Sequence, residues 1–293
     1  LDYSELAAIR LGYGLSPIIA SPADPQALLD TIANAAPEAD DIRMAEASEF
    51  QLALREARKN DADNGTRTAR EVNQRGARLG VRALRQRFAR AVGDPGGFGE
   101  RLVQFWADHF TVRGANSIEV LQAAAFVTEA IRPHINGRFV DMMFAAETHP
   151  RMLVYLDQRN SIGPNSRYSQ RRPDRNLGLN ENLAREMIEL HSLGVGADYT
   201  QKDVRELAEL LTGLTYNANS DTNFDPNRAE PGPETVLGFT YGGEDAARIE
   251  DVRAVINDLA AHEATAGHLA RKMAVHFVAD DPPQALVDRL KKA

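Results

Sequence analysis

Amide, carboxylate and guanidinium side chains are concentrated in one short stretch, residues 180–191, which reads NENLAREMIELH. At helical spacing, with about 100° between successive residues, Arg185, Glu186 and Glu189 fall within roughly 60° of Asn182. Such a face could hold a divalent cation, perform general acid–base chemistry or bind a polar ligand. The same residues also allow a solvated face braced by Arg–Glu pairs.

One histidine, His191, falls on the apolar side of this predicted helix, among residues such as Leu183 and Met187. It is either a core histidine with a hydrogen-bond partner or a ligand or proton carrier. Because His191 and the polar face lie on different sides of the helix, they cannot form one site without a second element.

The segment FWADHF, residues 105–110, is the candidate for that second element. Asp108 and His109 are adjacent on a helix, so their side chains point about 100° apart and cannot chelate an ion on their own. Each side chain could instead contact groups of the 181–193 helix. Asp108 could then orient an imidazole, as carboxylates do around many zinc ions. Simple helix packing, with His109 near a helix end, is the alternative.

An arginine-rich loop over residues 158–178 is the third candidate region. Arg171 and Arg172 are its adjacent pair of guanidinium groups, which could bind an anionic ligand or a protein partner. A solvated loop is the alternative. A second long loop, residues 216–243, is rich in Asn, Asp, Pro and Gly and includes a short predicted hairpin at VLGFTYGG. Loops of this length in a compact domain are usually functional or mobile.

Composition limits the function classes. The 293 residues carry a formal charge of −8, which argues against nucleic acid as a partner. Cysteine is absent, which excludes disulfides, thiolate metal sites and a cysteine nucleophile. No apolar run approaches the roughly 20 residues of a transmembrane helix. The sequence contains no HExxH motif, no GxSxG motif, no P-loop and no dinucleotide-binding fingerprint. No known catalytic signature is therefore complete.

Helical periodicity dominates the chain, and the predicted fold class is all-α: one multi-helix globular domain over residues 1–293, with two long loops and at most a short β-hairpin. A softer division separates residues 1–95 from a core, residues 96–293, that carries the NENLARE helix. The helix boundaries are marked by a start at Pro25 with Ser21 or Asp24 as its cap, by Asn116 with Glu119 and Thr200 with Asp203, and by a stop at Gly194. The DPGG at residues 94–97 predicts a break.

Several segments together resemble the bacterial family known as domain of unknown function 1800. They read RLGYGLSP (10–17), LVQFWADHFTV (102–112), HPRMLVYLD (149–157), GLNENLAREMIELHSLGVGADYTQKDVRELAELLTG (178–213) and HEATAGHLARKMAVHFVADDPP (262–283). They cover most of the chain in the order of the family. Two departures are His262-Glu263, where the family usually has His-Pro, and the end at Ala293, which suggests that a C-terminal part of the domain is missing.

The resemblance implies a helical, often exported bacterial protein, which favours a periplasmic or exported location over a cytoplasmic one. It implies no reaction and no catalytic residues. We therefore keep two hypotheses. The first is a binding or assembly protein of the cell envelope, and the second is a metal-assisted hydrolase with its site between residues 98–110 and 181–193. The hydrolase would use His109, Glu186, Glu189 and His191 as working groups, a divalent metal as cofactor, and Asp108, Asn182 and Arg185 as positioning residues.

Overall fold

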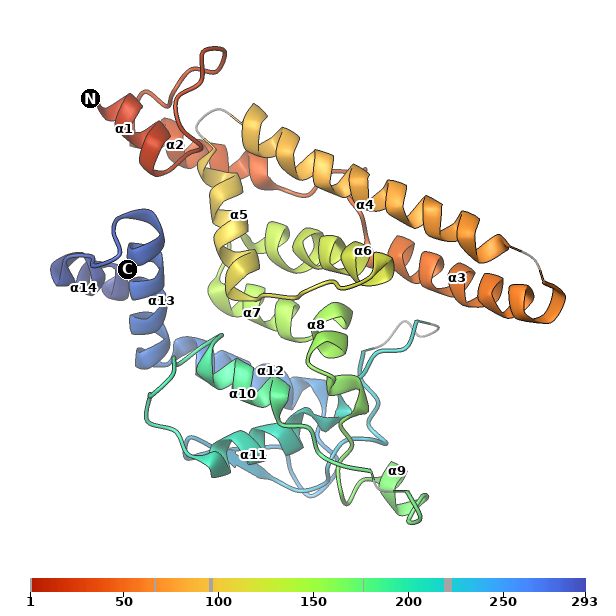
Figure 1. Ribbon diagram of the computed structural model, residues 1–293. Helices are drawn as coiled ribbons and strands as arrows, with labels where there is room; N and C mark the ends of the chain where they lie inside the picture. The colour runs from red at the N-terminus through yellow and green to blue at the C-terminus, as the bar shows by residue number, and fades with distance from the viewer. Residues whose placement is uncertain (1, 66, 95–96, 176, 219–222) are drawn as a thin grey trace. The chain divides into compact units, whose positions relative to one another are not determined.

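The computed structural model describes residues 2–65, 67–94, 97–175, 177–218 and 223–293. Over these residues it contains fourteen α-helices, several short 3₁₀ or π turns and one two-stranded antiparallel sheet (Figure 1). The predicted all-α class with a short hairpin is confirmed. The chain forms two compact units, residues 1–138 and 139–293, and each is described by itself. The single domain and its softer division at residue 95 stay predictions.

Six α-helices make up the first unit. They are α1 (Tyr3–Arg10), α2 (Pro25–Asp30), α3 (Met44–Asn64), α4 (Thr68–Gly93), α5 (Phe98–His109) and α6 (Ser117–Phe126). Helix α2 begins as predicted, because the Asp24 carboxylate accepts the N–H of Ala27 at 2.9 Å and Pro25 takes the first helical position. Two residues of the predicted DPGG break, 95 and 96, lie outside the described residues.

Helices α3 and α4 lie side by side as a long antiparallel pair (Figure 1). Gly76 is the one buried residue of α4, and it faces α3. A Cβ atom at Gly76 would lie 2.2 Å from the Phe50 ring of α3. The absence of a side chain at Gly76 therefore lets the two helices pack at this distance.

The second unit contains the remaining helices and the hairpin. They are α7 (Phe139–Glu147), α8 (Pro150–Tyr155), α9 (Arg167–Gln170), α10 (Asn182–Glu189), α11 (Gln201–Leu210), β1 (Glu234–Val236), β2 (Phe239–Tyr241), α12 (Ile249–Ala261), α13 (Glu263–Phe277) and α14 (Gln284–Lys292). Helices α10 and α11 pack together, and each contributes fully buried aliphatic side chains, such as Met187 of α10 and Leu207 of α11. Helix α11 starts with the predicted capping box of Thr200 and Asp203. Among the described residues, no helix is both long and apolar enough to span a membrane.

Helix α10 ends earlier than predicted, at Glu189 and not at Gly194. The N–H groups of Leu190 and His191 both donate to the Glu186 carbonyl, each at 2.9 Å, so the last turn closes there. The Ser192 hydroxyl then donates to the Met187 carbonyl at 2.6 Å and satisfies a helix-end acceptor. Because a side chain supplies this cap, the glycine was the wrong signal for the end of the helix.

The hairpin lies where VLGFTYGG predicted it, and α11 holds it through carboxylates. Leu237 and Gly238 form its two-residue turn, both with positive φ, as a type I′ turn requires. The N–H of Leu237 donates to Asp203 and the N–H of Thr235 to Glu206, each at 2.7 Å. The edge of β1 is therefore paired with helix side chains instead of another strand.

Candidate functional site

The polar face of α10 is occupied by one guanidinium group that contacts three neighbours. The Nη2 atom of Arg185 lies 3.1 Å from Glu181 Oε2, and its Nη1 atom lies 3.2 Å from Glu189 Oε1. Arg185 also donates to Gln201 Oε1 at 2.9 Å, and Gln201 in turn donates to Glu181 at 2.8 Å. We call these four residues the Arg185 network. It connects α10 to the start of α11.

The other predicted residues of this face lie around the network. Glu189 also bonds Tyr199, and burial together with this hydrogen bond raises the pKa of the tyrosine. Asn182 is exposed at the first turn, where its backbone N–H donates to Asn180 Oδ1 at 2.9 Å. Glu186 is half-buried, and its backbone carbonyl closes the end of the helix. The structure therefore brings Arg185 and Glu189 into direct contact within the predicted face.

His191 is buried just beyond the end of α10 and binds a carboxylate of α7. Its Nδ1 atom lies 2.7 Å from Oε1 of Glu147, whose side chain is also buried. The other oxygen, Oε2 of Glu147, has no hydrogen-bond partner among the described residues. Glu147 is not among the residues predicted from the sequence. The pattern of polar and apolar residues on α7 could not reveal the contact between Glu147 and His191, because the two residues are far apart in the chain.

Asp108 and His109 belong to the first unit. His109 is buried at the end of α5, where its ring makes edge-to-face contacts with Trp106 and Phe110 at centroid distances of 5.5 and 4.6 Å. Asp108 is exposed, and its backbone carbonyl accepts a hydrogen bond from the Thr111 hydroxyl. The hydrolase hypothesis combined α5 with α10, which belong to different units, so that shared site stays a prediction.

Arg171 and Arg172 lie at the end of the short helix α9 in the arginine-rich loop. The Arg172 guanidinium stacks over the Tyr168 ring at 3.9 Å from the ring centroid, whereas Arg171 is exposed. Backbone hydrogen bonds tie this loop to the second long loop, including Gly163 N–H to the Arg228 carbonyl at 2.9 Å. The anion or partner role of Arg171 and Arg172 stays a prediction.

A carboxylate cluster that was not predicted from the sequence lies between α11 and the hairpin. Buried Glu234 of β1 shares hydrogen bonds with Glu206 and Glu209, which lie one helical turn apart on α11. Burial and the negative charges of Glu209 and Glu206 raise the pKa of Glu234 to about 8. The spacing of Glu206 and Glu209 is visible in the sequence, but the approach of β1 depends on tertiary structure.

Within the described part of the chain, no group of three or more histidine, aspartate and glutamate side chains is placed to hold a metal ion together. In the second unit the predicted residues instead form two separate groups. One is the partly exposed Arg185 network, and the other is the buried His191–Glu147 pair.

An apolar groove lies on the surface of the first unit. It encloses about 690 Å³ between the second half of α4 and residues 13–21. Leu84, Phe88 and Val92 of α4 form one wall, and Tyr13 and Leu15 are part of the other. A volume of this size falls in the range of sites that bind small molecules or peptide side chains.

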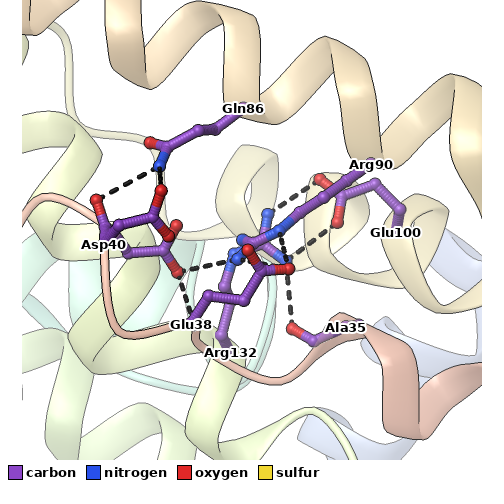
Figure 2. Close-up of polar contacts among 8 residues, drawn as sticks. Ala35, Glu38, Asp40, Gln86, Arg90, Glu100 and Arg132 are labelled. Atoms are coloured by element: carbon purple, nitrogen blue, oxygen red, sulfur yellow. Dashed lines mark hydrogen bonds and ion pairs between the residues drawn. The ribbon is translucent and has the colours of Figure 1, made fainter.

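Toward its C-terminal end, α4 is attached to its own unit by polar side chains (Figure 2). Gln86 donates to Asp40 Oδ2 at 2.8 Å, and Arg90 donates to Glu38 Oε1 at 3.2 Å. Nearby, the buried Arg132 guanidinium forms a bidentate ion pair with Glu100, both contacts at 2.8 Å. Ionic and amide contacts therefore anchor this end of α4, while its apolar side chains line the groove.

Comparison with known proteins gives one match. The model of the family described as "Protein of unknown function (DUF1800)" matches residues 7–293. No curated protein and no solved structure matches the chain.

Proposed function

Since this chain belongs to the DUF1800 family, whose function is unknown, we propose from its own residues that it is a non-catalytic binding or assembly protein. The observation that carries this proposal is the Arg185 network. Its guanidinium already binds two carboxylates and an amide, so the polar face of α10 is engaged in joining α10 to α11. A ligand at this face would have to displace those contacts.

The proposal places this role in the cell envelope. Its support is the family resemblance, which implies an exported protein. Fractionation of a bacterial host that expresses the full-length protein tests the location. Recovery in the periplasmic or membrane fraction is expected, and recovery in the cytosol alone would contradict it.

Replacement of Glu189 by alanine tests the structural role of the network. The Arg185 and Glu189 side chains are 41% and 22% exposed, so the network is not a fully buried ion pair. We expect Glu189→Ala to lower the free energy of unfolding by about 1 kcal/mol, because partly exposed ion pairs contribute at most about that much. The matched control Glu189→Gln can still bind Arg185 and Tyr199 and should lose less.

Denaturant unfolding followed by circular dichroism measures both variants. If Glu189→Ala unfolds like the parent protein but abolishes a hydrolytic activity that the parent shows, Glu189 is a catalytic group and the binding proposal fails.

The metal-assisted hydrolase remains a second candidate because of the His191–Glu147 pair. A buried carboxylate that binds one imidazole nitrogen is the arrangement that orients many metal-binding histidines. Elemental analysis of the purified protein, combined with melting curves with and without a chelator, tests this candidate. Stoichiometric metal, and a chelator-sensitive melting temperature that Glu186→Ala abolishes, would favour it. A metal-free protein with identical curves would reject it.

A further inference from the structure

Helix α4 presents an apolar stripe to solvent. Val81, Leu84, Phe88 and Val92 are all exposed, with 53% of Leu84 and 61% of Phe88 accessible. At about 100° per residue these four positions fall within roughly 80° of one another. They therefore form one continuous face of the helix and are not isolated surface residues.

The spacing of the apolar residues in this stripe is suited to packing against a second helix. Ala77, Val81, Leu84, Phe88 and Ala91 are separated by alternating steps of four and three residues. Alternating steps of three and four keep apolar side chains on the seam between two packed helices. The opposite side of α4 already packs against α3 and α6, so the stripe is a free helix face of the first unit.

The groove makes one end of the stripe concave. Its second wall, residues 13–21, is attached to α5 at Tyr13, whose hydroxyl accepts a hydrogen bond from Gln104 at 2.6 Å. Just before this wall, Arg101 of α5 donates to the carbonyl of Arg10, the last residue of α1, at 2.7 Å. Because these contacts hold the wall in place, the groove is formed before any partner binds. A preformed groove reduces the ordering cost of binding.

The charge of α4 identifies the chemistry of the partner. The helix carries seven arginines and a single acidic residue, Glu71, although the whole chain has a net charge of −8. Two of the arginines, Arg82 and Arg90, bind carboxylates of their own unit. For the other five, no ion pair with a described residue is present. They are Arg70, Arg75, Arg78, Arg85 and Arg87. Acidic side chains on the partner would neutralise them.

We propose that α4 and residues 13–21 bind an amphipathic helix of a partner protein, with apolar residues at alternating three- and four-residue steps and Asp or Glu residues on both flanks. The proposal rests on the binding role proposed above and names its surface and partner class. A peptide helix matches both the concave groove and the seam spacing, whereas an anionic lipid surface is flat. From Val81 to Val92 the stripe is about 16 Å long, so about three turns of partner helix would cover it.

A fluorescent peptide of about 18 residues tests this proposal by anisotropy. The acidic probe has Leu at the seam positions and Glu on both flanks, and a basic control has Lys in place of Glu. The whole chain should bind the acidic probe at least about tenfold more tightly than the basic control, and added salt should weaken that binding. Equal affinity for the two peptides, or no binding of the acidic one at millimolar concentration, would overturn the proposal.

Two variants locate the binding surface. Phe88→Asp places a charge in the groove and should weaken binding of the acidic probe at least about tenfold. The matched control Val195→Asp changes an even more exposed apolar residue of the second unit and should leave binding unchanged. Because both positions are exposed, both variants should melt like the parent. An equal loss in the two variants would mean that the probe binds elsewhere.

A charge-reversal variant tests the arginines separately. Arg85→Glu combined with Arg87→Glu should bind the basic control more tightly than the acidic probe. Flotation with phosphatidylcholine vesicles containing about one quarter phosphatidylglycerol tests a lipid surface. Vesicle binding without peptide binding would mean that the surface binds a membrane and not a partner helix. Self-association that Phe88→Asp abolishes would mean that the surface binds a second copy of the chain. A hydrolytic activity would overturn the proposed function but would leave the peptide measurement valid.

Discussion

Helices α4 and α10 both combine arginine with aliphatic residues, but they orient them in opposite ways. In α10, Leu183 and Met187 are completely buried, and the polar face is occupied by the Arg185 network. In α4, arginine and glutamine side chains attach the helix to its own unit, while Leu84 and Phe88 face solvent. The apolar face of α10 is therefore covered within its own unit, whereas the apolar stripe of α4 is left exposed.

Truncation of one apolar side chain on each helix should give the largest contrast. Met187→Ala removes a completely buried side chain and should lower the free energy of unfolding by about 2–5 kcal/mol. Leu84→Ala removes a half-exposed side chain and should change it by less than about 0.5 kcal/mol. Urea unfolding of both variants measures the effect. A large loss of stability in Leu84→Ala would show that the stripe on α4 is already covered within the chain.

Stability should respond to pH through the carboxylates of the second unit. The pKa of Glu234 is raised to about 8 in the folded protein, above the ordinary value of 4.5. The folded protein therefore keeps a proton that the unfolded chain loses. This contribution is complete below the ordinary value and disappears as the pH rises to about 8, with a steepest slope of about 1.4 kcal/mol per pH unit.

Glu234→Gln should remove this slope and make the protein more stable near pH 8, which thermal melting across this pH range can measure. Asp203, on the same hairpin interface, is the opposite control. Burial alone would raise its pKa, but hydrogen bonds from Thr200 and Leu237 hold the pKa below its ordinary value. Asp203→Asn should therefore destabilise the protein at neutral pH. Parallel pH profiles for the parent protein and Glu234→Gln would contradict the role of the shared proton.

Two glycines of α4 should give smaller effects than Met187→Ala, with opposite signs. Gly76→Ala would place a Cβ atom 2.2 Å from the Phe50 ring and should lower stability by about 1–3 kcal/mol. Gly80→Ala meets only Val120, at an ordinary 3.7 Å, and should raise stability by about 0.5–1 kcal/mol because alanine favours a helix. Melting of the two variants under one condition tests how tightly α4 packs. Equal changes would show that α4 does not pack closely on α3 at Gly76.

Local signals predicted much of the fold. Asp24 with Pro25, and Thr200 with Asp203, begin helices at the predicted positions, and the hairpin forms at VLGFTYGG. These features depend on residues only a few positions apart. The predicted stop at Gly194 was wrong because the Ser192 hydroxyl bonds the Met187 carbonyl and ends the region of helical geometry sooner. The end of α10 was therefore set by the Ser192 side chain and not by the glycine.

The candidate sites were less predictable. Helical spacing brought Arg185 and Glu189 together correctly, since both lie on one helix. The carboxylate that binds His191 comes from Glu147, 44 residues earlier. Likewise, Glu234 reaches Glu206 and Glu209 only through the docking of the hairpin on α11. A periodic pattern contains no information about such distant partners.

The sequence by itself determined the helical class, most of the helix starts and the polar face of α10, because hydrogen bonds and side-chain periodicity within a few residues control these features. Only the tertiary structure decided which apolar residues are used inside the protein. The stripe of α4 and the apolar face of α10 look alike in the sequence. Gly76 lets α4 pack on α3 through its opposite side, so its stripe remains exposed, whereas α10 has its apolar face buried in the second unit.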